Sequence, residues 1–527
     1  MSSDTFGPER VVLPAWEHYV TMASLEGSAL SIVTLVDCAN HRLREGLTHR
    51  TWWVRGLSIL TLCLLVGAPV GAILGLLGWM YGSAALAAMA VGYLILRSPL
   101  VGLLSAIAII TLLPFAAVPV DIGFSPTFLD LALAGLYLVW LSRLLARKDT
   151  RLVTTPTTMP LLLFIMLAIV SYVRGLEHAS LTANNIRHFA EILLSLGLFL
   201  VVTNIIRSRE RLRIAVVALM AGGAIAAFVG TVLYLIPRDL STRILSALRV
   251  VRYPSGIDVL RYVEDNPDLP LRAISTSVDP NVLGGLLIFT TTITAAMALA
   301  PKPVLPRAIL FGMVGVMVIC MVLTYSRGSF AGLAVAIGLL AVLRYRKLAW
   351  FGLLGLALLF LLPWTQNYVA HFIEGVQGQD LATQMRFGEY KDALILIGRY
   401  PWFGVGFSGT PDIDTYLGVS NVYLQIAEQM GVVGLLAFLA AIGSYGWHFM
   451  QSYQALKRDE DLQPIALGIT LAVCGGLFGG LFDHYLFNLV FPHASSLLWL
   501  TIGLGAAAAN LAANPERLPP QESIWLG

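Results

Sequence analysis

Residues 309–343 read "ILFGMVGVMVICMVLTYSRGSFAGLAVAIGLLAVL", two apolar runs separated by a short polar stretch that contains Arg327. Each run approaches the roughly 20 residues that a helix needs to cross the hydrocarbon core of a bilayer. We therefore expect two membrane helices joined by a tight turn at Gly328. An arginine costs roughly 2.5–3.5 kcal/mol at mid-span and much less near the interface. Its presence beside two spans is the feature that the rest of the sequence has to explain.

The composition places the whole chain in the same class. Of its 527 residues, 57% are hydrophobic and 12% are charged, whereas a soluble protein carries about twice that charge. The sequence predicts an all-α multi-pass membrane protein. Four cysteines stand singly, so they indicate neither a disulfide framework nor a metal site. The net charge is +3 and no run of like charges points to nucleic acid.

Apolar runs long enough to span a bilayer recur along the chain. We predict about fourteen such spans. They lie near 57–75, 78–95, 99–118, 128–146, 159–174, 187–206, 214–236, 282–300, 308–325, 328–343, 348–363, 430–450, 464–482 and 493–511.

Basic residues give these spans an orientation. A cytoplasmic N-terminus puts the strongly basic short loops, such as "RSRERLR" at 207–213, on the cytoplasmic side. The first 50 residues show no signal-peptide pattern, so we expect the first membrane helix to direct insertion. The predicted organisation is a cytoplasmic segment 1–54, membrane helices 1–11 in 55–363 with an external loop at 237–281, a long external loop 364–429, membrane helices 12–14 in 430–511, and a cytoplasmic tail 512–527.

The long external loop 364–429 contains a predicted amphipathic helix, and long loops often carry function. Its apolar and charged positions fall on different faces at helical spacing. The apolar face holds Leu381, Met385, Leu394 and Ile397, and the charged face holds Arg386, Glu389 and Asp392. We expect this helix to lie over the mouth of the membrane domain.

Three more arginines lie outside with Arg327, namely Arg187, Arg272 and Arg386. Each one alone is compatible with a solvated, ion-paired or snorkelling side chain. A guanidinium is also a planar fork that binds phosphate oxygens through charge-assisted hydrogen bonds. Taken together, the four arginines predict a cationic cavity that opens outward and binds an anion.

Five ordered motifs across about 187–510 resemble the O-antigen ligase and O-antigen polymerase superfamily of bacterial membrane glycosyltransferases. The first is the arginine at 187 before its span. The others are "RAISTSVDPNVLGGLL" at 272–287, "TYSRGSFAGL" at 324–333, "MRFGEYKDALILIGRYPWFGVGFSG" at 385–409 and "SNVYLQIAEQMGVVGLLAFL" at 420–439. The resemblance rests on their order and on their common external side.

The resemblance implies a C-type glycosyltransferase-like membrane fold and transfer of glycan from a lipid pyrophosphate, usually undecaprenyl pyrophosphate, to a growing glycan. It implies no cofactor and no metal. Arg327 and Arg386 would bind the donor pyrophosphate and stabilise its departure. Arg187 and Arg272 would be supporting cations, and Asn281, Asn421 and Glu389 would bind substrate.

The same resemblance implies partners and a location. The partners would be the lipid-linked oligosaccharide, an acceptor glycan, the lipid bilayer, a chain-length regulator and a flippase. The protein would lie in the bacterial inner membrane with its active site on the periplasmic, external face.

The sequence departs from the family at one position. Ligases of this family typically carry a histidine immediately before the asparagine of the fifth motif, and this chain has Ser420 there. A serine is a poor general base at neutral pH. Alternative bases are Glu389, Asp414 and His484, of which His484 has the most suitable ordinary pKa. Asp483 beside it would orient the ring or cap the span.

Two other apparent motifs carry less weight. Gly404, Gly406 and Gly409 spell G-x-G-x-x-G, but they follow a predicted helix and not a strand, so we expect a turn and not a dinucleotide site. Asp412 and Asp414 resemble the metal-binding pair of nucleotide-sugar transferases, yet they stand alone in a Gly/Pro-rich loop.

The leading hypothesis is therefore a polysaccharide polymerase that acts on O-antigen or exopolysaccharide repeats. A ligase that moves the glycan to lipid A core, and a protein-directed oligosaccharyltransferase, are alternatives within the same chemistry. A secondary transporter is a different class, and it predicts ionisable residues near the membrane midplane. The charges noted here lie at external span ends, which favours the enzyme. A purely structural or sensory protein gives no reason for the four arginines.

Overall fold

The computed structural model describes residues 51–63, 67–119, 123–146, 152–178, 181–256, 259–346, 381–407 and 418–513, with single residues 350, 361 and 377. The chain divides into two compact units, residues 1–97 and 98–527.

The first unit contains α3 (Trp52–Leu62) and α4 (Ala68–Arg97) among its described residues. Gly78 has a non-helical conformation, with φ 74° and ψ 167°, and it divides α4 into two helical parts. The predicted boundary between the spans 57–75 and 78–95 therefore coincides with a break in the helix, whereas the span predicted at 57–75 covers the end of α3 and the first part of α4. Only glycine adopts this conformation readily.

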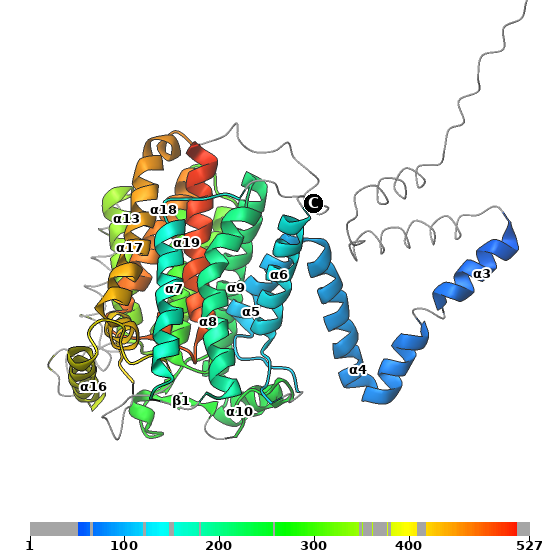
Figure 1. The fold of residues 1–527 in the computed structure, drawn as a ribbon, viewed down its shortest axis with the longest axis horizontal. Coiled ribbons are helices and arrows are strands. Elements are labelled where there is room, and N and C mark those ends of the chain that lie inside the picture. Colours follow the sequence, from blue (N-terminus) through cyan, green and yellow to red (C-terminus); the bar gives the residue numbers. More distant parts are fainter. Residues whose placement is uncertain are drawn as a thin grey trace, which may run out of the picture. The chain divides into compact units, whose positions relative to one another are not determined.

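The second unit is a bundle of helices whose long axes run in similar directions (Figure 1). Its helices up to the hairpin are α5 (Pro99–Leu112), α6 (Phe128–Leu145), α7 (Thr158–Gly175), α8 (Ala183–Ile205), α9 (Arg209–Leu235), α10 (Arg238–Ala247) and η2 (Leu248–Val251). The hairpin consists of β1 (Arg261–Tyr262), η4 (Val263–Asp265) and β2 (Leu271–Arg272). It is followed by α11 (Pro280–Ala298), α12 (Arg307–Leu323), α13 (Arg327–Leu343), α16 (Leu381–Arg399), α17 (Val422–Lys457), α18 (Leu462–Gly479), η6 (Tyr485–Phe487) and α19 (Pro492–Ala513).

These helices confirm the all-α multi-pass class. Within the described residues, eight helices are long and apolar enough to cross a membrane. They are α6, α7, α8, α9, α11, α17, α18 and α19, and α5, α12 and α13 are shorter apolar helices. These eleven helices coincide with eleven of the twelve spans predicted between 99 and 511. The twelfth, 348–363, falls largely outside the described residues.

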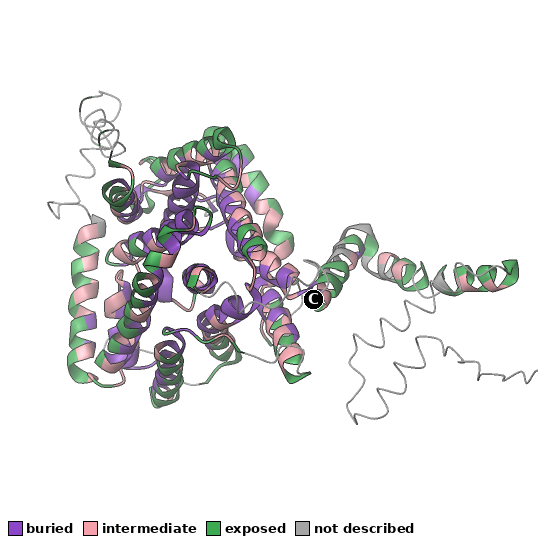
Figure 2. Cartoon of the chain, turned by 90° about the horizontal axis from the view of Figure 1, so that it is seen from above, coloured by how far each residue is buried: buried purple, intermediate pink, exposed green. Residues whose placement is uncertain are grey.

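Buried positions face the interior of this bundle and exposed positions face outward (Figure 2). Large apolar side chains are nevertheless common on the outside, with Leu138, Phe228 and Leu436 all about 60% exposed. Extensive exposed apolar surface is expected where lipid replaces water as the solvent.

Local capping explains where several helices begin. Asp279 accepts hydrogen bonds from the backbone N–H groups of Asn281 and Val282 at the start of α11, at 2.7 and 3.1 Å, and Pro280 occupies the first helical position. Thr127 and Asp130 form a reciprocal capping box at the start of α6. Each cap satisfies backbone donors that have no partner within the helix. The sequence therefore determines these helix starts locally.

The helix α11 lies in the core, with 94% of its apolar window buried. Three of its threonines would be costly there if their hydroxyls were unpaired. Thr290, Thr292 and Thr294 each donate to the carbonyl oxygen four residues earlier, at 3.0, 2.7 and 2.6 Å. The helix thus satisfies these three hydroxyls itself, whereas the buried hydroxyl of Thr291 has no hydrogen-bond partner among the described residues.

Small residues bring α13 close to α11 and α18. A Cβ added at Gly332 would lie 2.6 Å from the carbonyl oxygen of Gly475, and one added at Gly284 would lie 2.3 Å from the Ser329 hydroxyl. Such close approach of backbones is typical of helix packing in membranes. It brings the first turn of α13, which begins with Arg327, against the first turn of α11 and the last turn of α18.

The turn before α13 differs from the prediction of a turn at Gly328. The positive φ belongs to Tyr325, at 51°, and Gly328 lies inside the first turn of α13. A Cβ at Gly328 would lie 2.9 Å from the Cβ of Phe482. The lack of a side chain at Gly328 thus allows Phe482 to pack against it.

The segments predicted as long external loops lie at one end of the second unit. The helix α10, the β1–β2 hairpin and α16 share this end (Figure 1). The helix α17 starts within the predicted loop 364–429, eight residues before the predicted span at 430, and it kinks at Gly431, φ 70°. A Cβ at Gly431 would lie 2.2 Å from the carbonyl oxygen of Trp402, so the backbone of the segment that follows α16 packs directly against the kink.

Candidate functional site

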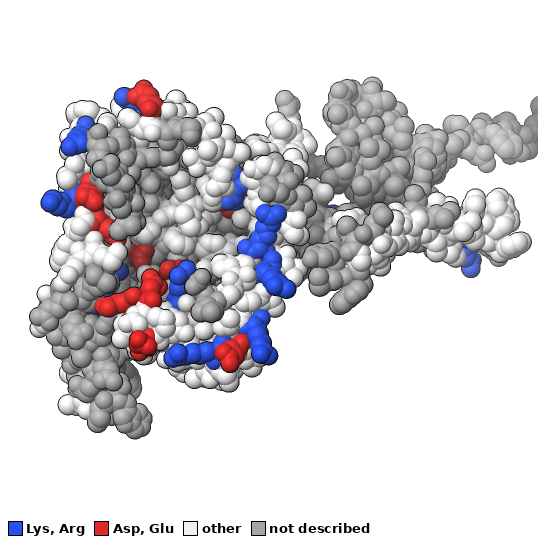
Figure 3. Space-filling view, turned by 90° about the horizontal axis from the view of Figure 1, so that it is seen from below, with Lys and Arg blue, Asp and Glu red and all other residues white. Residues whose placement is uncertain are grey.

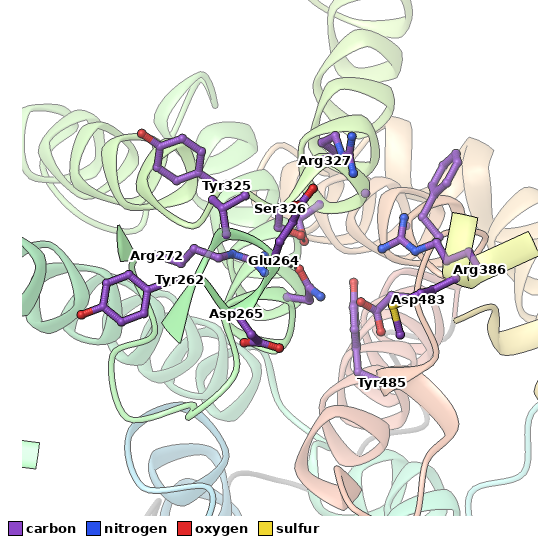
Figure 4. A pocket seen from close by; sticks show the side chains of 17 residues that line it. Tyr262, Glu264, Asp265, Arg272, Tyr325, Ser326, Arg327, Arg386, Asp483 and Tyr485 are labelled. Atoms are coloured by element: carbon purple, nitrogen blue, oxygen red, sulfur yellow. Dashed lines mark hydrogen bonds between the residues drawn. The ribbon is translucent and has the colours of Figure 1, made fainter. Parts of the chain in front are cut away.

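A pocket of about 220 Å³ opens at the end of the second unit that carries the hairpin and α16 (Figure 4). Five parts of the chain build it: the hairpin, the first turn of α11, the α12–α13 turn, α16 and the segment after α18. Its charged lining residues are Arg272, Arg327, Arg386, Glu264, Asp265 and Asp483. Three of the four arginines predicted to surround a cavity therefore do so.

Arg327 contributes both its side chain and its position at a helix end. It is the first residue of α13, and Ser326, Gly328 and Ser329 of the same turn also line the pocket. The first turn of a helix presents backbone N–H groups with no partner in the helix, and the helix dipole favours an anion there. The helix end and the guanidinium therefore favour the same kind of ligand.

Arg272 makes two hydrogen bonds to neutral groups. Its Nε donates to the carbonyl oxygen of Thr324 at 2.8 Å, and one terminal nitrogen donates to Oδ1 of Asn281 at 2.7 Å. The backbone N–H of Ala273 also donates to the carbonyl oxygen of Leu323 at 2.8 Å. These bonds fix the guanidinium at the end of α12, and the two side-chain bonds do not cancel its charge because the acceptors are uncharged. The predicted site residue Asn281 thus lines the pocket beside Arg272.

Arg386 reaches the pocket from α16 (Figure 4). Four residues later, the hydroxyl of Tyr390 lies 3.3 Å from the carbonyl oxygens of both Ser420 and Leu481, and it donates to them. Phe387 and Leu394 on the same helix are about 60% exposed. Arg386 and Glu389 of the predicted charged face therefore face the bundle, together with the buried Ala393 and Leu396, whereas Leu394 of the predicted apolar face is exposed.

Two predicted substrate-binding residues lie beside the pocket without lining it. The carboxylate of Glu389 accepts a hydrogen bond from the backbone N–H of Ser420 at 2.9 Å. Asn421 caps α17 by accepting from the N–H groups of Tyr423 and Leu424, and its side-chain nitrogen donates to the carbonyl oxygen of Leu481 at 3.0 Å. Both residues join α16, α17 and the segment after α18, so contact with substrate stays a prediction for them.

The candidate base His484 is one residue away from the pocket lining. Asp483 lines the pocket, and its Oδ1 accepts from the backbone N–H of His484 at 2.7 Å and lies 3.7 Å from the ring Nδ1. The Asp483 side chain is 15% exposed. Burial raises its pKa above the ordinary value, the charge of Asp279 adds to this rise, and His484 and Arg386 oppose it. Of the neighbours Asp483 and His484, Asp483 is therefore the one in direct reach of a ligand.

The acidic residues Glu264 and Asp265 form a wall of the pocket that the sequence did not reveal. Both have left-handed backbone conformations, with φ of 54° and 53°. Such conformations cost roughly 1–2 kcal/mol for residues other than glycine, and they cluster at functional sites. No sequence pattern predicts that a glutamate adopts a left-handed backbone conformation. Figure 3 shows both acidic and basic side chains on this face of the unit.

The fourth arginine does not line the pocket. Arg187, on α8, donates to Asp130 at 2.9 Å and to Glu191 at 3.3 Å. Glu191 also accepts from the hydroxyl of Thr127 at 3.0 Å, and the ring of His188 lies beside the guanidinium. The charge of Arg187 is thus compensated by carboxylates. Its predicted role as a supporting cation stays a prediction.

The G-x-G-x-x-G motif has a packing role at its described positions. Gly404 and Gly406 have φ of 68° and 86°, and a Cβ at Gly406 would lie 2.4 Å from the Cα of Gly175. The prediction of a turn is confirmed there, while Gly409, Asp412 and Asp414 lie outside the described residues. The described residues contain no group of three His, Cys, Asp or Glu that would hold a metal ion.

Comparison with known families singles out the central part of this site. Residues 312–439 match a family model described as O-antigen ligase. The matched range includes Arg327 and Arg386, which line the pocket. It also includes Glu389 and Asn421, which connect α16, α17 and the segment after α18. A comparison with curated proteins finds no significant match.

Proposed function

The chain carries a domain of the O-antigen ligase family at residues 312–439, and on this basis we propose that it is a polysaccharide polymerase. The family supports a glycosyltransferase-like enzyme of the O-antigen ligase and polymerase superfamily, with lipid-linked glycan as substrate. The proposal adds that the donor is a lipid pyrophosphate and that the acceptor is a growing glycan on the external, periplasmic face of the inner membrane. It adds further that no metal takes part.

One observation supports this proposal most directly. Arg272, Arg327 and Arg386 converge with the N-terminus of α13 on a single pocket. A pyrophosphate carries several negative charges that such a set of donors matches. A charge-assisted hydrogen bond contributes on the order of 1.5–3 kcal/mol. Several bonds of this kind bind the pyrophosphate group more strongly than they bind a neutral solute.

The proposed reaction is a displacement at the anomeric carbon of the donor sugar. The acceptor hydroxyl oxygen forms a bond to this carbon while the bond from the carbon to the phosphate oxygen breaks. The electron pair of that bond leaves with the pyrophosphate, where negative charge accumulates. Arg327, Arg386 and the N–H groups of α13 are positioned before the reaction and meet this charge, so they lower the barrier.

The acceptor proton needs a base, and Asp483 is the residue that we assign. The Asp483 carboxylate lines the pocket, whereas His484 does not line it and lies beside this carboxylate, with its Nδ1 3.7 Å from Oδ1. His484 would then be a positioning residue or the next proton carrier. This reassigns the role that the sequence proposed for His484 to its neighbour, because only Asp483 reaches the pocket.

Ser420 favours a polymerase over a ligase. The family's ligases typically have a histidine at this position, and here the backbone of Ser420 is bound to Glu389. Membership of the superfamily does not separate the two activities. A ligase that acts on lipid A core or another acceptor is the second candidate, with the same donor site.

Reconstitution of the purified protein with a lipid-pyrophosphate oligosaccharide tests the proposal. We expect a ladder of extended lipid-linked chains, separated by gel electrophoresis and identified by mass spectrometry. A single transfer to added lipid A core, without a ladder, would establish the ligase instead.

A third outcome would contradict the enzyme altogether. If no donor gives any product and the same vesicles show flux of a solute, the protein is a transporter. Proteoliposomes that lack the protein serve as the control for passive leakage.

A further inference from the structure

The pocket has two chemically different sides. Figure 4 shows Arg386 and Asp483 on one side, and Tyr262, Arg272 and Asp265 on the other. The arginines and α13 account for binding of an anion, but a cavity made only for an anion has no use for exposed carboxylates. The acidic hairpin side therefore needs its own explanation.

The hairpin holds its acidic residues at the pocket. Its two strands pair in antiparallel register, Arg261 with Arg272 and Tyr262 with Leu271. The backbone N–H of Val263 continues the pairing by donating to the carbonyl oxygen of Pro270 at 3.1 Å. Since Arg272 is bound to the end of α12, this pairing fixes the turn that carries Glu264 and Asp265.

Both carboxylates are available to a ligand. Glu264 and Asp265 are exposed, and neither side chain makes a hydrogen bond or ion pair within the part of the chain that the structure describes. Arg272 lies on the same side, but the two carboxylates outnumber it, and its guanidinium is held by Thr324 and Asn281. Among the charged residues that line this side of the pocket, two carboxylates thus stand against one guanidinium.

Tyr485 gives an independent indication of a ligand. Its side chain is only 2% exposed, its hydroxyl is drawn pointing into the pocket (Figure 4), and no hydrogen-bond partner with good geometry meets it among the described residues. Ser329 is a polar neighbour. A Cβ at Gly285 would lie 2.5 Å from the ring, so the ring has no room to turn away. A buried hydroxyl is normally satisfied, which points to a polar group of the ligand.

We propose that Glu264, Asp265 and Tyr485 form the acceptor subsite, which binds the hydroxyl groups of an uncharged terminal sugar and discriminates against an anionic one. This inference rests on the proposed function, because it assumes a glycan acceptor. It assigns the hairpin carboxylates and Tyr485 to the acceptor and leaves Arg272, Arg327, Arg386 and the start of α13 to the donor pyrophosphate.

The chemistry of these groups fits a sugar. Ionised carboxylates accept strong hydrogen bonds from hydroxyl groups, and a tyrosine offers both an apolar ring face and a hydroxyl. The same carboxylates repel a uronic acid or a phosphate group. Placing a repulsive group against the wrong partner is a general means of specificity. It would also prevent the donor pyrophosphate from binding at the acceptor side.

Two acceptors that differ only in charge test the proposal. Purified protein in proteoliposomes receives one lipid-pyrophosphate donor and a glycan that ends either in glucose or in glucuronic acid. We expect transfer to the neutral acceptor to be about tenfold faster, the order expected for one or two partly screened charge contacts.

The variant Glu264→Gln/Asp265→Asn removes the repulsion and should bring the two rates within about threefold, with the donor KM unchanged. Tyr485→Phe should raise the KM for both acceptors to a similar degree, because it removes a hydrogen bond and no charge. Asp268→Asn is the matched control, since it removes a charge from the same loop at a residue that does not line the pocket. It should leave the preference as in the unmodified protein.

The proposed subsite would be overturned if Glu264→Gln/Asp265→Asn still transfers to the neutral acceptor while its discrimination between the two acceptors and its acceptor KM stay unchanged. Equal transfer to both acceptors by the unmodified protein would overturn it as well. Failure of the proposed function looks different, because then the unmodified protein transfers to neither acceptor. Size-exclusion profiles and thermal unfolding of each variant show whether it folds.

Discussion

The arginines of the pocket and Arg187 look alike in the sequence and are treated differently by the fold. Arg272 is held by a carbonyl oxygen and an amide oxygen, both uncharged. Arg187 is held by the carboxylates of Asp130 and Glu191, at 2.9 and 3.3 Å, and Glu191 is fully buried. A neutral partner fixes the direction of a guanidinium and preserves its charge, whereas a carboxylate fixes it and compensates the charge. These hydrogen bonds to neutral groups and its position in the pocket therefore distinguish Arg272 from Arg187.

The largest effect should follow from removing a pocket arginine that is expected to meet the leaving group. Arg327→Ala and Arg386→Ala should each lower kcat by about 10²–10³-fold, because each removes a preorganised positive charge from the transition state. Turnover of the lipid-pyrophosphate donor measures the loss. Arg249→Ala removes an exposed arginine that does not line the pocket and should retain activity. Full activity in both pocket variants would exclude these two arginines from the reaction.

The pocket carboxylate should give an effect almost as large, together with a pH signature. Asp483→Asn should lower kcat by about 10²-fold, since it removes a general base. Burial raises the pKa of Asp483, so activity should fall as the pH decreases through a value above the ordinary aspartate range.

The charged and titratable groups that face Asp483 are Asp279 at the N-cap of α11, Arg386 and Tyr390 on α16, and His484 and Tyr485 beside it. The pH–rate profile of Asp483→Asn should lose its acidic limb, while that of His484→Gln should retain it. If Asp483 only positions Arg386, its variant will raise the donor KM and leave the pH dependence in place.

A smaller effect should follow from loosening Arg272 without removing it. Asn281→Ala deletes one neutral hydrogen bond, at 2.7 Å, and leaves the charge. A bond of this kind is worth about 1 kcal/mol, so we expect a loss of roughly fivefold in kcat/KM. Asn281→Asp keeps the contact and replaces the neutral partner by a carboxylate. Asn281→Asp should lower activity more than Asn281→Ala does. Equal activity of the two variants would contradict the idea that a neutral partner leaves the charge of Arg272 available to the ligand.

Arg187 should show almost no effect on the folded enzyme and a clear effect on stability. Arg187→Ala leaves the buried carboxylates without their cation, which costs about 3 kcal/mol where a buried pair is broken. A lower midpoint of thermal unfolding in detergent measures this loss. Arg187→Ala/Glu191→Gln should recover part of it. A donor KM that rises in Arg187→Ala at unchanged stability would instead support the supporting-cation role.

Prediction from the sequence succeeded where the cause is local. The apolar runs located eleven helices of the second unit, and the predicted helix at 381–399 appears as α16. It failed where the cause is contact between distant segments. The suspected turn at Gly328 lies at Tyr325, and Gly328 instead packs against Phe482 from a distant segment. His484 was preferred to Asp483 because pKa can be judged from residue type, whereas the direction of a side chain cannot.

The sequence by itself determined the class of protein, the approximate spans and the family, since hydrophobic length and motif order are properties of the chain alone. Only the tertiary structure decided which charges act together. Arg272, Arg327 and Arg386 are up to 114 residues apart, and the close packing of α11, α13 and α18 brings their segments to one pocket. The same packing adds Glu264, Asp265 and Tyr485, which no motif marked, because the environment of a side chain depends on segments that fold against it from elsewhere.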